Sequence, residues 1–235
     1  MPTKLQAIGR RIVLRSAVTG LGAAMIAAGT ASCSTGAPNN TMTPQRETQP
    51  AQTTPVPGGN GARVLLAYFS RAGENYHDGG RVHLDVGNTE VLAGMLSALI
   101  TCDVHRVDPA EPYSVNYDAT VARNVQEQNE NARPAISGPL PSIEQYDTVL
   151  LASGIWNVRA PMIMTTFAES HDFAGKTVHA VTTHAMSGLG TTKRDYAQSC
   201  RGAIIGEGLA IRGERVRDSG PDIESWLRRN GLLQR

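Results

Sequence analysis

The chain has 235 residues, of which 40% are hydrophobic, so it can form one domain of ordinary size with extensions and bury a substantial core. Its 22 basic and 21 acidic residues give a formal charge of +1, and no basic patch favours nucleic acid as a partner. The charge is unevenly distributed, because residues 1–33 contain four basic residues and no acidic one. The remaining residues, 18 basic against 21 acidic, carry a mildly acidic net charge of −3.

The N-terminus predicts an export signal. Arg10 and Arg11, followed by three apolar residues and Arg15, resemble a twin-arginine signal. The weakly hydrophobic run over residues 17–28 is too short to cross a bilayer as an ordinary transmembrane helix. The alternative interpretation is an ordinary signal region that happens to contain adjacent arginines. We therefore expect residues 1–33 to direct export of the protein.

A cysteine at the end of this signal predicts an attachment site for a lipid. Thr30, Ala31 and Ser32 precede Cys33 and resemble a lipobox, with cleavage after Ala31 by a general signal peptidase as the alternative. Residues 34–60 are rich in Thr, Pro, Gln, Asn and Gly, which predicts a disordered linker. Lipidation would place the protein at the cell envelope, in contact with the membrane only through the lipid; otherwise we expect it to be periplasmic or extracellular.

The start of the remaining region, residues 61–235, predicts a site for an anion. Residues 64–69 form an apolar run typical of a buried parallel strand, and apolar residues recur at helical spacing after Asn88 and Thr89. With Asn88 as the expected N-cap, the helix would direct unpaired N–H groups and partial positive charge toward the strand end. Ser70, Thr89 and nearby backbone amides could then surround a phosphate.

Strand and helix patterns alternate through the rest of the chain. This alternation predicts an α/β fold with a doubly wound parallel sheet. Besides 64–69, the expected strands are residues 103–107, 147–153 and 177–182 and one within 203–211. The expected helices after the first are 117–131, 161–170 and 191–200 and a C-terminal one on which Ile223, Trp226 and Leu227 share a face.

Ligands of such sheets bind at the carboxyl ends of the strands, which selects three loops. They are residues 70–89, 153–161 and 183–190, each polar or rich in glycine after an apolar strand. Trp156 in the second loop is better explained by packing than by stacking on a ligand when considered alone. The six histidines show no zinc-ligand spacing, so we expect no metal site.

Several motifs, in order, carry a resemblance to a known family. YFSRAGEN, VGNTEV, ARPAISGPLPSIEQYDTVLLASGIW, TTHAMSGLG and GLAIRG resemble the flavodoxin-like family, in particular a bacterial branch with an extended first loop. The similarity spans residues 63–232. It implies a five-stranded parallel sheet of order 2-1-3-4-5, helices on both faces and FMN at the carboxyl edge.

The resemblance also implies roles for individual residues. The flavin ring would lie between the second and third loops, with its phosphate on the first. Residues expected at the phosphate are Ser70, Ala72, Asn75, Asn88 and Thr89. Residues expected at the ring are Gly154, Ile155 and Trp156 on one side and Thr183, His184, Ser187 and Gly188 on the other.

From the resemblance we expect an FMN-binding redox protein that transfers electrons at the cell envelope. Its partner would be a redox protein or a small-molecule acceptor such as a quinone. Two alternatives stay open: a small NAD(P)H-dependent quinone or flavin reductase, and a lipoprotein that kept the fold and binds another anionic ligand.

Overall fold

The computed structural model describes residues 63–233 of the chain. The predicted export signal, the linker and the lipid site at Cys33 therefore lie outside the described residues. Within the described part, no helix is both long and apolar enough to cross a bilayer.

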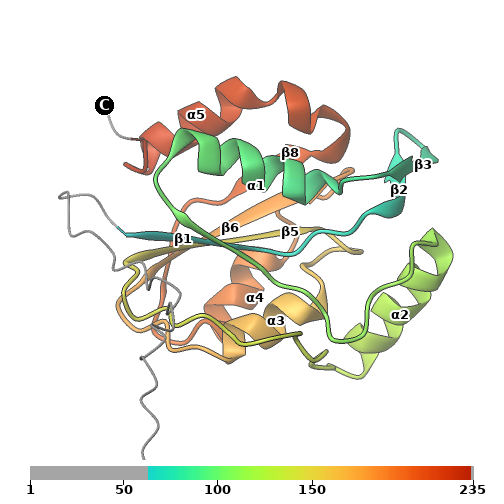
Figure 1. Cartoon of the computed structure of the whole chain (residues 1–235), viewed down its shortest axis with the longest axis horizontal. Helices are drawn as coiled ribbons and strands as arrows, with labels where there is room; N and C mark the ends of the chain where they lie inside the picture. Colours follow the sequence, from blue (N-terminus) through green and yellow to red (C-terminus); the bar gives the residue numbers. More distant parts are fainter. Residues whose placement is uncertain (1–62, 234–235) are drawn as a thin grey trace, which may run out of the picture. The chain divides into compact units, whose positions relative to one another are not determined.

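A parallel sheet forms the centre of the fold (Figure 1). Its strand order is β4-β1-β5-β6, with β7 and β8 both pairing with β6 at the far edge. The strands are β1 (Val64–Tyr68), β4 (Asp103–Arg106), β5 (Thr148–Gly154), β6 (Thr177–His184), β7 (Ile204–Ile205) and β8 (Leu209–Arg212). Taking β7 and β8 as one interrupted strand, this is the order 2-1-3-4-5, which confirms the predicted α/β architecture.

The predicted fifth strand is divided because side chains bind the backbone between its halves. The carbonyl oxygen of Glu207 accepts a hydrogen bond from Trp226 Nε1 at 3.2 Å and lies 2.9 Å from His179 Nδ1. Gly206 packs so closely on the imidazole that an added Cβ would lie 2.4 Å from His179 Cε1. The backbone therefore leaves the sheet at Gly206 and returns at Leu209.

Helices cover both faces of the sheet. In Figure 1, α1 and α5 lie on one face and α3 and α4 on the other. Successive side chains of β1 enter opposite cores: Leu65 packs in the cluster that contains Phe167 of α3, and Leu66 packs in the cluster that contains Leu92 of α1. The helices are α1 (Asn88–Leu99), α2 (Tyr117–Asn129), α3 (Met162–Glu169), α4 (Thr192–Ser199) and α5 (Gly220–Arg229), and a 3₁₀ helix, η1 (Gly213–Asp218), follows β8.

The first loop contains structure that was not predicted. It forms an antiparallel hairpin of β2 (Gly73–His77) and β3 (Gly80–Leu84). Asp78 and Gly79 form its turn with φ values of 44° and 87°. An Asp-Gly pair with positive φ at both positions suits the two-residue turn whose twist matches that of the strands. The dipeptide was therefore the sequence signal for this hairpin.

The predicted N-cap at Asn88 is wrong. Gly87 is the N-cap, and Asn88 is the first residue of α1. Ser70 takes over the capping role, since its Oγ accepts a hydrogen bond from the backbone N–H of Glu90 at 3.1 Å. Only glycine fits at position 87, because a Cβ there would lie 2.3 Å from Ser70 Oγ.

Candidate functional site

A cleft of about 570 Å³ opens at the carboxyl edge of the sheet, a volume typical of a small-molecule site. Its floor is the end of β1, the start of α1 and the start of η1. We call residues 154–159 and 183–191 the loop wall, of which 154–157 and 183–187 line the cleft. We call β2 and α2 the hairpin wall, which contributes Asn75, Tyr76 and one face of α2 to the cleft. The walls meet where Gln128 Nε2 of α2 donates a hydrogen bond to the carbonyl oxygen of Trp156 at 3.1 Å.

The structure brings most of the predicted site residues to this one cleft. Those that line it are Ser70, Asn75, Asn88, Thr89, Gly154, Ile155, Trp156, Thr183, His184 and Ser187. Ala72 and Gly188 are not among the lining residues. Ala72 is exposed where the chain turns into the hairpin, and the carbonyl oxygen of Gly188 accepts a hydrogen bond from Thr182 Oγ1 at 3.1 Å.

The floor offers hydrogen-bond donors at the N-terminus of α1. Asn88 and Thr89 stand in the first turn, where backbone N–H groups have no intrahelical acceptor and the helix dipole favours an anion. The Thr89 and Thr183 hydroxyl oxygens are 2.7 Å apart, which fixes both side chains between α1 and β6. This arrangement suits a phosphate group.

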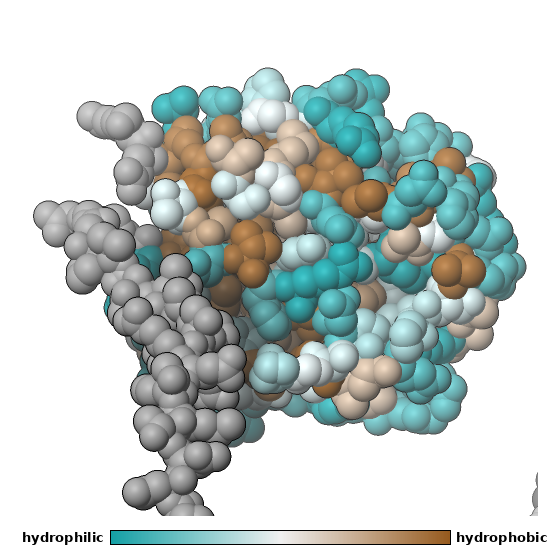
Figure 2. Space-filling model, in the orientation of Figure 1, coloured by the Kyte–Doolittle hydropathy of each residue, from teal (hydrophilic) through white to brown (hydrophobic). Residues whose placement is uncertain are grey.

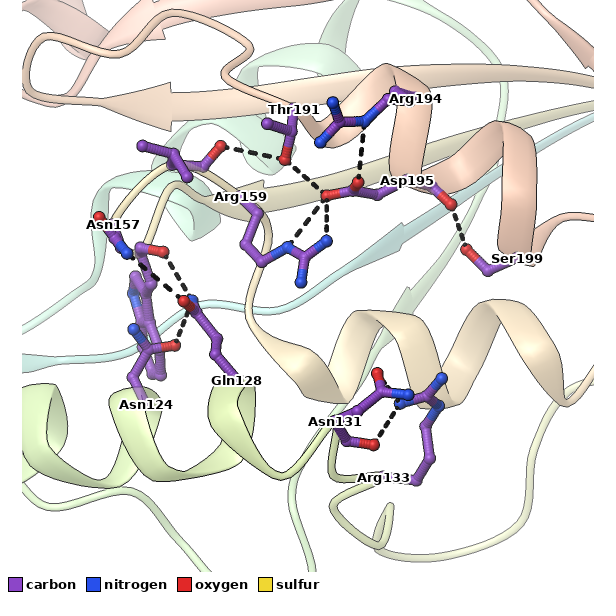
Figure 3. Close-up of polar contacts among 12 residues, drawn as sticks. Asn124, Gln128, Asn131, Arg133, Asn157, Arg159, Thr191, Arg194, Asp195 and Ser199 are labelled. Carbon is purple, nitrogen blue, oxygen red and sulfur yellow. Dashed lines mark hydrogen bonds and ion pairs between the residues drawn. The ribbon is translucent and has the colours of Figure 1, made fainter.

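The two loops of the loop wall are bound to each other (Figure 3). The backbone N–H of Thr191 donates to the carbonyl oxygen of Val158 at 2.8 Å, and Ser187 Oγ donates to the carbonyl oxygen of Asn157 at 3.4 Å. Arg159 Nη2 lies 2.9 Å from Asp195 Oδ2 of α4. The loops therefore form one continuous surface, and the open space lies between this surface and the hairpin wall.

Trp156 belongs both to the core and to the cleft. Its ring packs edge-on against Phe69 and Tyr113, with centroids 5.4 Å and 4.8 Å apart. The packing interpretation of this side chain is therefore correct, and the remaining part of its partly buried surface lines the cleft.

Of the hairpin wall, the sequence predicted Asn75 but not the α2 face. Its α2 face consists of Tyr117, Thr120, Val121, Asn124 and Val125. These residues follow the three- and four-residue spacing of one helix face, so the signal was present. This spacing did not indicate a binding site, because hydroxyl, amide and valine side chains also occur on ordinary solvent-facing helices.

Arg71 and Glu214 bring opposite charges to the cleft. Arg71 Nη1 donates to the carbonyl oxygens of Ser114 and Val115 at 2.8 Å and 3.2 Å, and burial lowers the pKa of its guanidinium. Burial also lowers the pKa of His184, so its imidazole favours the neutral form. His184 Nδ1 is buried and has no hydrogen-bond partner within the described residues.

Comparisons with known proteins agree with the fold. A family model described as flavodoxin matches residues 82–230. A presumed flavoprotein from Bacteroides eggerthii DSM 20697 is similar in structure, with a TM-score of 0.58 and 27% identity over 73% of this chain and 98% of that chain. A second, from Bacteroides uniformis ATCC 8492, has a TM-score of 0.56 and 26% identity over 72% of this chain and 99% of that chain. No curated protein matches the sequence. Since the family model covers more than half of the chain, the chain belongs to the flavodoxin family.

Proposed function

We propose that the chain binds FMN in the cleft and transfers electrons at the cell envelope. The observation that carries the proposal is the convergence of polar residues from the ends of β1, β5 and β6 on one cleft, beside the N-terminus of α1. Ligands of doubly wound sheets bind at this edge. Membership of the flavodoxin family supports the same ligand.

The residues present fit the parts of FMN. Ser70 Oγ and the backbone N–H groups of Asn88 and Thr89 would hold the phosphate. Ile155 and Trp156 offer apolar surface to the ring, and His184 Nδ1 is a buried polar atom that a ligand could satisfy. When bound, FMN supplies the ability to carry electrons. The protein orients the flavin, limits access of water and sets its potential through local hydrogen bonds and charges.

Titration of the purified protein with FMN tests this function. We expect flavin fluorescence to be quenched at saturation. Thr89→Val should weaken FMN binding about tenfold, because it removes a hydroxyl group beside the phosphate position. Thr101→Val, at an exposed position outside the cleft, is the matched control and should bind like the wild type. Absence of FMN binding by the wild type overturns the proposal and favours a lipoprotein that binds another anion.

A reductase is the second candidate, and one feature favours it. Val121 and Val125 of α2 are 41% and 45% exposed although they line the cleft. Exposed apolar surface inside a cleft is suited to an apolar second ligand, such as a quinone. Adding NADH or NADPH to the FMN-loaded protein distinguishes the two functions. A reductase bleaches the flavin absorbance without a partner protein, whereas an electron carrier needs a protein donor.

Export and attachment at Cys33 belong to the same proposal, because they would place the electron transfer at the cell envelope. The twin-arginine pattern supports export, since that route suits a domain that folds around its cofactor before export, and the lipobox-like residues before Cys33 support the attachment. Fractionation of cells should find the wild type with the membranes and Cys33→Ser in the soluble envelope fraction. An uncleaved chain in the cytoplasm contradicts this part of the proposal.

A further inference from the structure

Glu214 places a buried carboxylate in the cleft. Its side chain is only 3% exposed, and it lines the cleft at the start of η1. Oε1 accepts a hydrogen bond from the backbone N–H of Asp78 at 3.3 Å, which ties η1 to the tip of the hairpin. Oε2 is buried and has no hydrogen-bond partner among the described residues. A buried carboxylate oxygen that accepts no hydrogen bond from the protein can accept one from a ligand in the cleft.

The charge of Glu214 is only partly compensated. Arg212 Nε lies 3.6 Å from Glu214 Oε2, but Arg212 Nη2 also lies 3.3 Å from Asp78 Oδ1. The guanidinium of Arg212 is thus shared between the carboxylates of Glu214 and Asp78. Burial acts to raise the pKa of Glu214, but hydrogen bonds from the backbone N–H groups of Glu214 and Asp78 and the charge of Arg212 outweigh it, so the pKa is lowered. The carboxylate is therefore ionised at neutral pH.

Glu214 lines the same cleft as the residues expected at the phosphate, and the backbone beside it lies against α1. Gly213, which precedes Glu214, packs against the side chain of Asn88 so closely that an added Cβ would lie 2.4 Å from Asn88 Nδ2. Asn88 is the first residue of α1, whose N-terminus forms the anion site. A carboxylate in a partly buried site repels a nearby phosphate more strongly than an exposed one would, because solvent screens it less.

The cation that lines the cleft, Arg71, does not cancel this effect. Arg71 is directed by hydrogen bonds to the carbonyl oxygens of Ser114, Val115 and Glu74, on the side of the hairpin wall. Arg71 is thus held against the segment that precedes α2, whereas Glu214 stands in η1 and is bound to the hairpin tip through Asp78.

We propose that Glu214 is a specificity-determining residue that reduces the preference of the site for FMN over flavin without the phosphate: its carboxylate accepts a hydrogen bond from a ligand hydroxyl group and weakens binding of the phosphate dianion. The site then takes riboflavin as well as FMN. This inference rests on flavin binding as the proposed function, but it concerns the charge of the ligand rather than its ring.

The first test uses the full-length wild-type protein, titrated separately with FMN and with riboflavin at pH 7.5 and 0.15 M salt. Hydrogen bonds to a phosphate from a helix N-terminus and a hydroxyl group would ordinarily favour FMN by more than about a hundredfold. We expect a preference for FMN below about thirtyfold. A larger preference overturns the inference and leaves the proposed function intact, whereas failure to bind either flavin overturns both.

The second test changes the charge with little change of shape. Glu214→Gln keeps an oxygen for the Asp78 N–H, and it should increase the preference for FMN over riboflavin about tenfold. Asp85→Asn is the matched control. It removes the same charge from a fully exposed side chain directly after β3, and it should leave the preference for FMN unchanged. An unchanged preference in Glu214→Gln, or an equal shift in Asp85→Asn, contradicts the role of Glu214.

Discussion

The two walls of the cleft are held in place by different kinds of interaction. The loop wall depends on close backbone contacts and on the half-buried pair of Arg159 and Asp195. The hairpin wall also has a close backbone contact, from the backbone N–H of Glu74 to the carbonyl oxygen of Val115 at 2.8 Å. It depends otherwise on charged side chains nearer the surface, since Arg81 of β3 makes two hydrogen bonds to the carboxylate of Asp118, at 2.8 Å and 2.6 Å. Glu74 of β2 accepts a hydrogen bond from the backbone N–H of Tyr117 at 2.9 Å.

The surface around the hairpin is polar. In Figure 2 the right-hand side, where the hairpin lies in Figure 1, is mainly hydrophilic. Solvent and salt weaken exposed ion pairs, whereas they have little access to backbone contacts. The loop wall should therefore be a fixed surface, and the hairpin wall should be the adjustable one. The predictions below test this comparison, starting with the largest expected effect.

Gly190→Ala should disrupt the loop wall. Gly190 has a φ of 51°, and an added Cβ would lie 2.1 Å from the carbonyl oxygen of Val158. We expect the free energy of unfolding to fall by about 3 kcal/mol, measured by chemical denaturation. Gly188→Ala is the control, because its φ is 58° but nothing lies within 4 Å of the new Cβ. It should cost about 1 kcal/mol, and equal losses in both variants would show that the close contact is unimportant.

Asp195→Asn should loosen the link between the second loop and α4. Its Oδ2 accepts hydrogen bonds from Arg159 Nε at 3.0 Å and Thr191 Oγ1 at 2.6 Å. Because the Asp195 side chain is only 15% exposed, we expect a loss of about 2 kcal/mol. Arg194→Gln tests the exposed partner of the same carboxylate, 3.7 Å away, and should cost less than about 0.5 kcal/mol. A larger loss of stability in Arg194→Gln than in Asp195→Asn would contradict the role given to Asp195.

Acid should destabilise the core and the loop wall. Burial lowers the pKa values of four histidines, which are His105, His171, His179 and His184. An unfolded chain binds protons at histidine near pH 6.5, so below that pH it binds more protons than the folded chain. The contribution of these histidines to the free energy of unfolding should therefore be fully present above pH 6.5. It should be lost progressively as the pH falls toward their lower pKa values in the folded chain.

Thermal unfolding at pH 7.5 and 5.5, at constant ionic strength, measures this dependence. His171→Gln should reduce the difference in melting temperature between the two pH values, because it removes one of the buried imidazoles. The same melting temperature at both pH values would contradict the prediction.

Arg81→Gln should have the smallest effect, limited to the hairpin wall. We expect nearly unchanged global stability but faster hydrogen exchange of the β2 and β3 amides, because the link to Asp118 is lost. High salt should reproduce this effect in the wild type. Arg228→Gln, which removes an exposed pair with Glu224 on α5, is the control. Unchanged exchange in Arg81→Gln would mean that the hairpin is held by other contacts.

Much of the fold could be predicted because its signals are local. The buried strand at residues 64–68 and the helix with Leu92 and Leu96 on its buried side are evident from hydrophobic spacing. The N-cap could not be placed, because the capping hydroxyl comes from Ser70, seventeen residues before Gly87 in the chain. The division of the last strand likewise depends on His179 and Trp226, which are distant in sequence from each other.

Prediction of the site from the sequence has the same limit, because contacts between distant residues leave no local pattern. Residues at strand ends such as Gly154 and Thr183 could be predicted, because parallel strands bring their carboxyl ends to one edge. Glu214 could not, since one acidic residue in a charged segment has no distinctive pattern. Its importance arises only from its burial beside α1.

The interruption at Gly206 to Gly208 also affects how the protein meets copies of itself. An unpaired edge strand can recruit another chain into the sheet and so begin aggregation. Here the β7 and β8 side offers only two short runs of backbone, and the opposite edge, β4, is four residues long with Asp103 and Arg106 at its ends. Neither border gives a neighbouring molecule a long template for strand addition. That protection would matter most for molecules concentrated by a lipid anchor on one membrane surface.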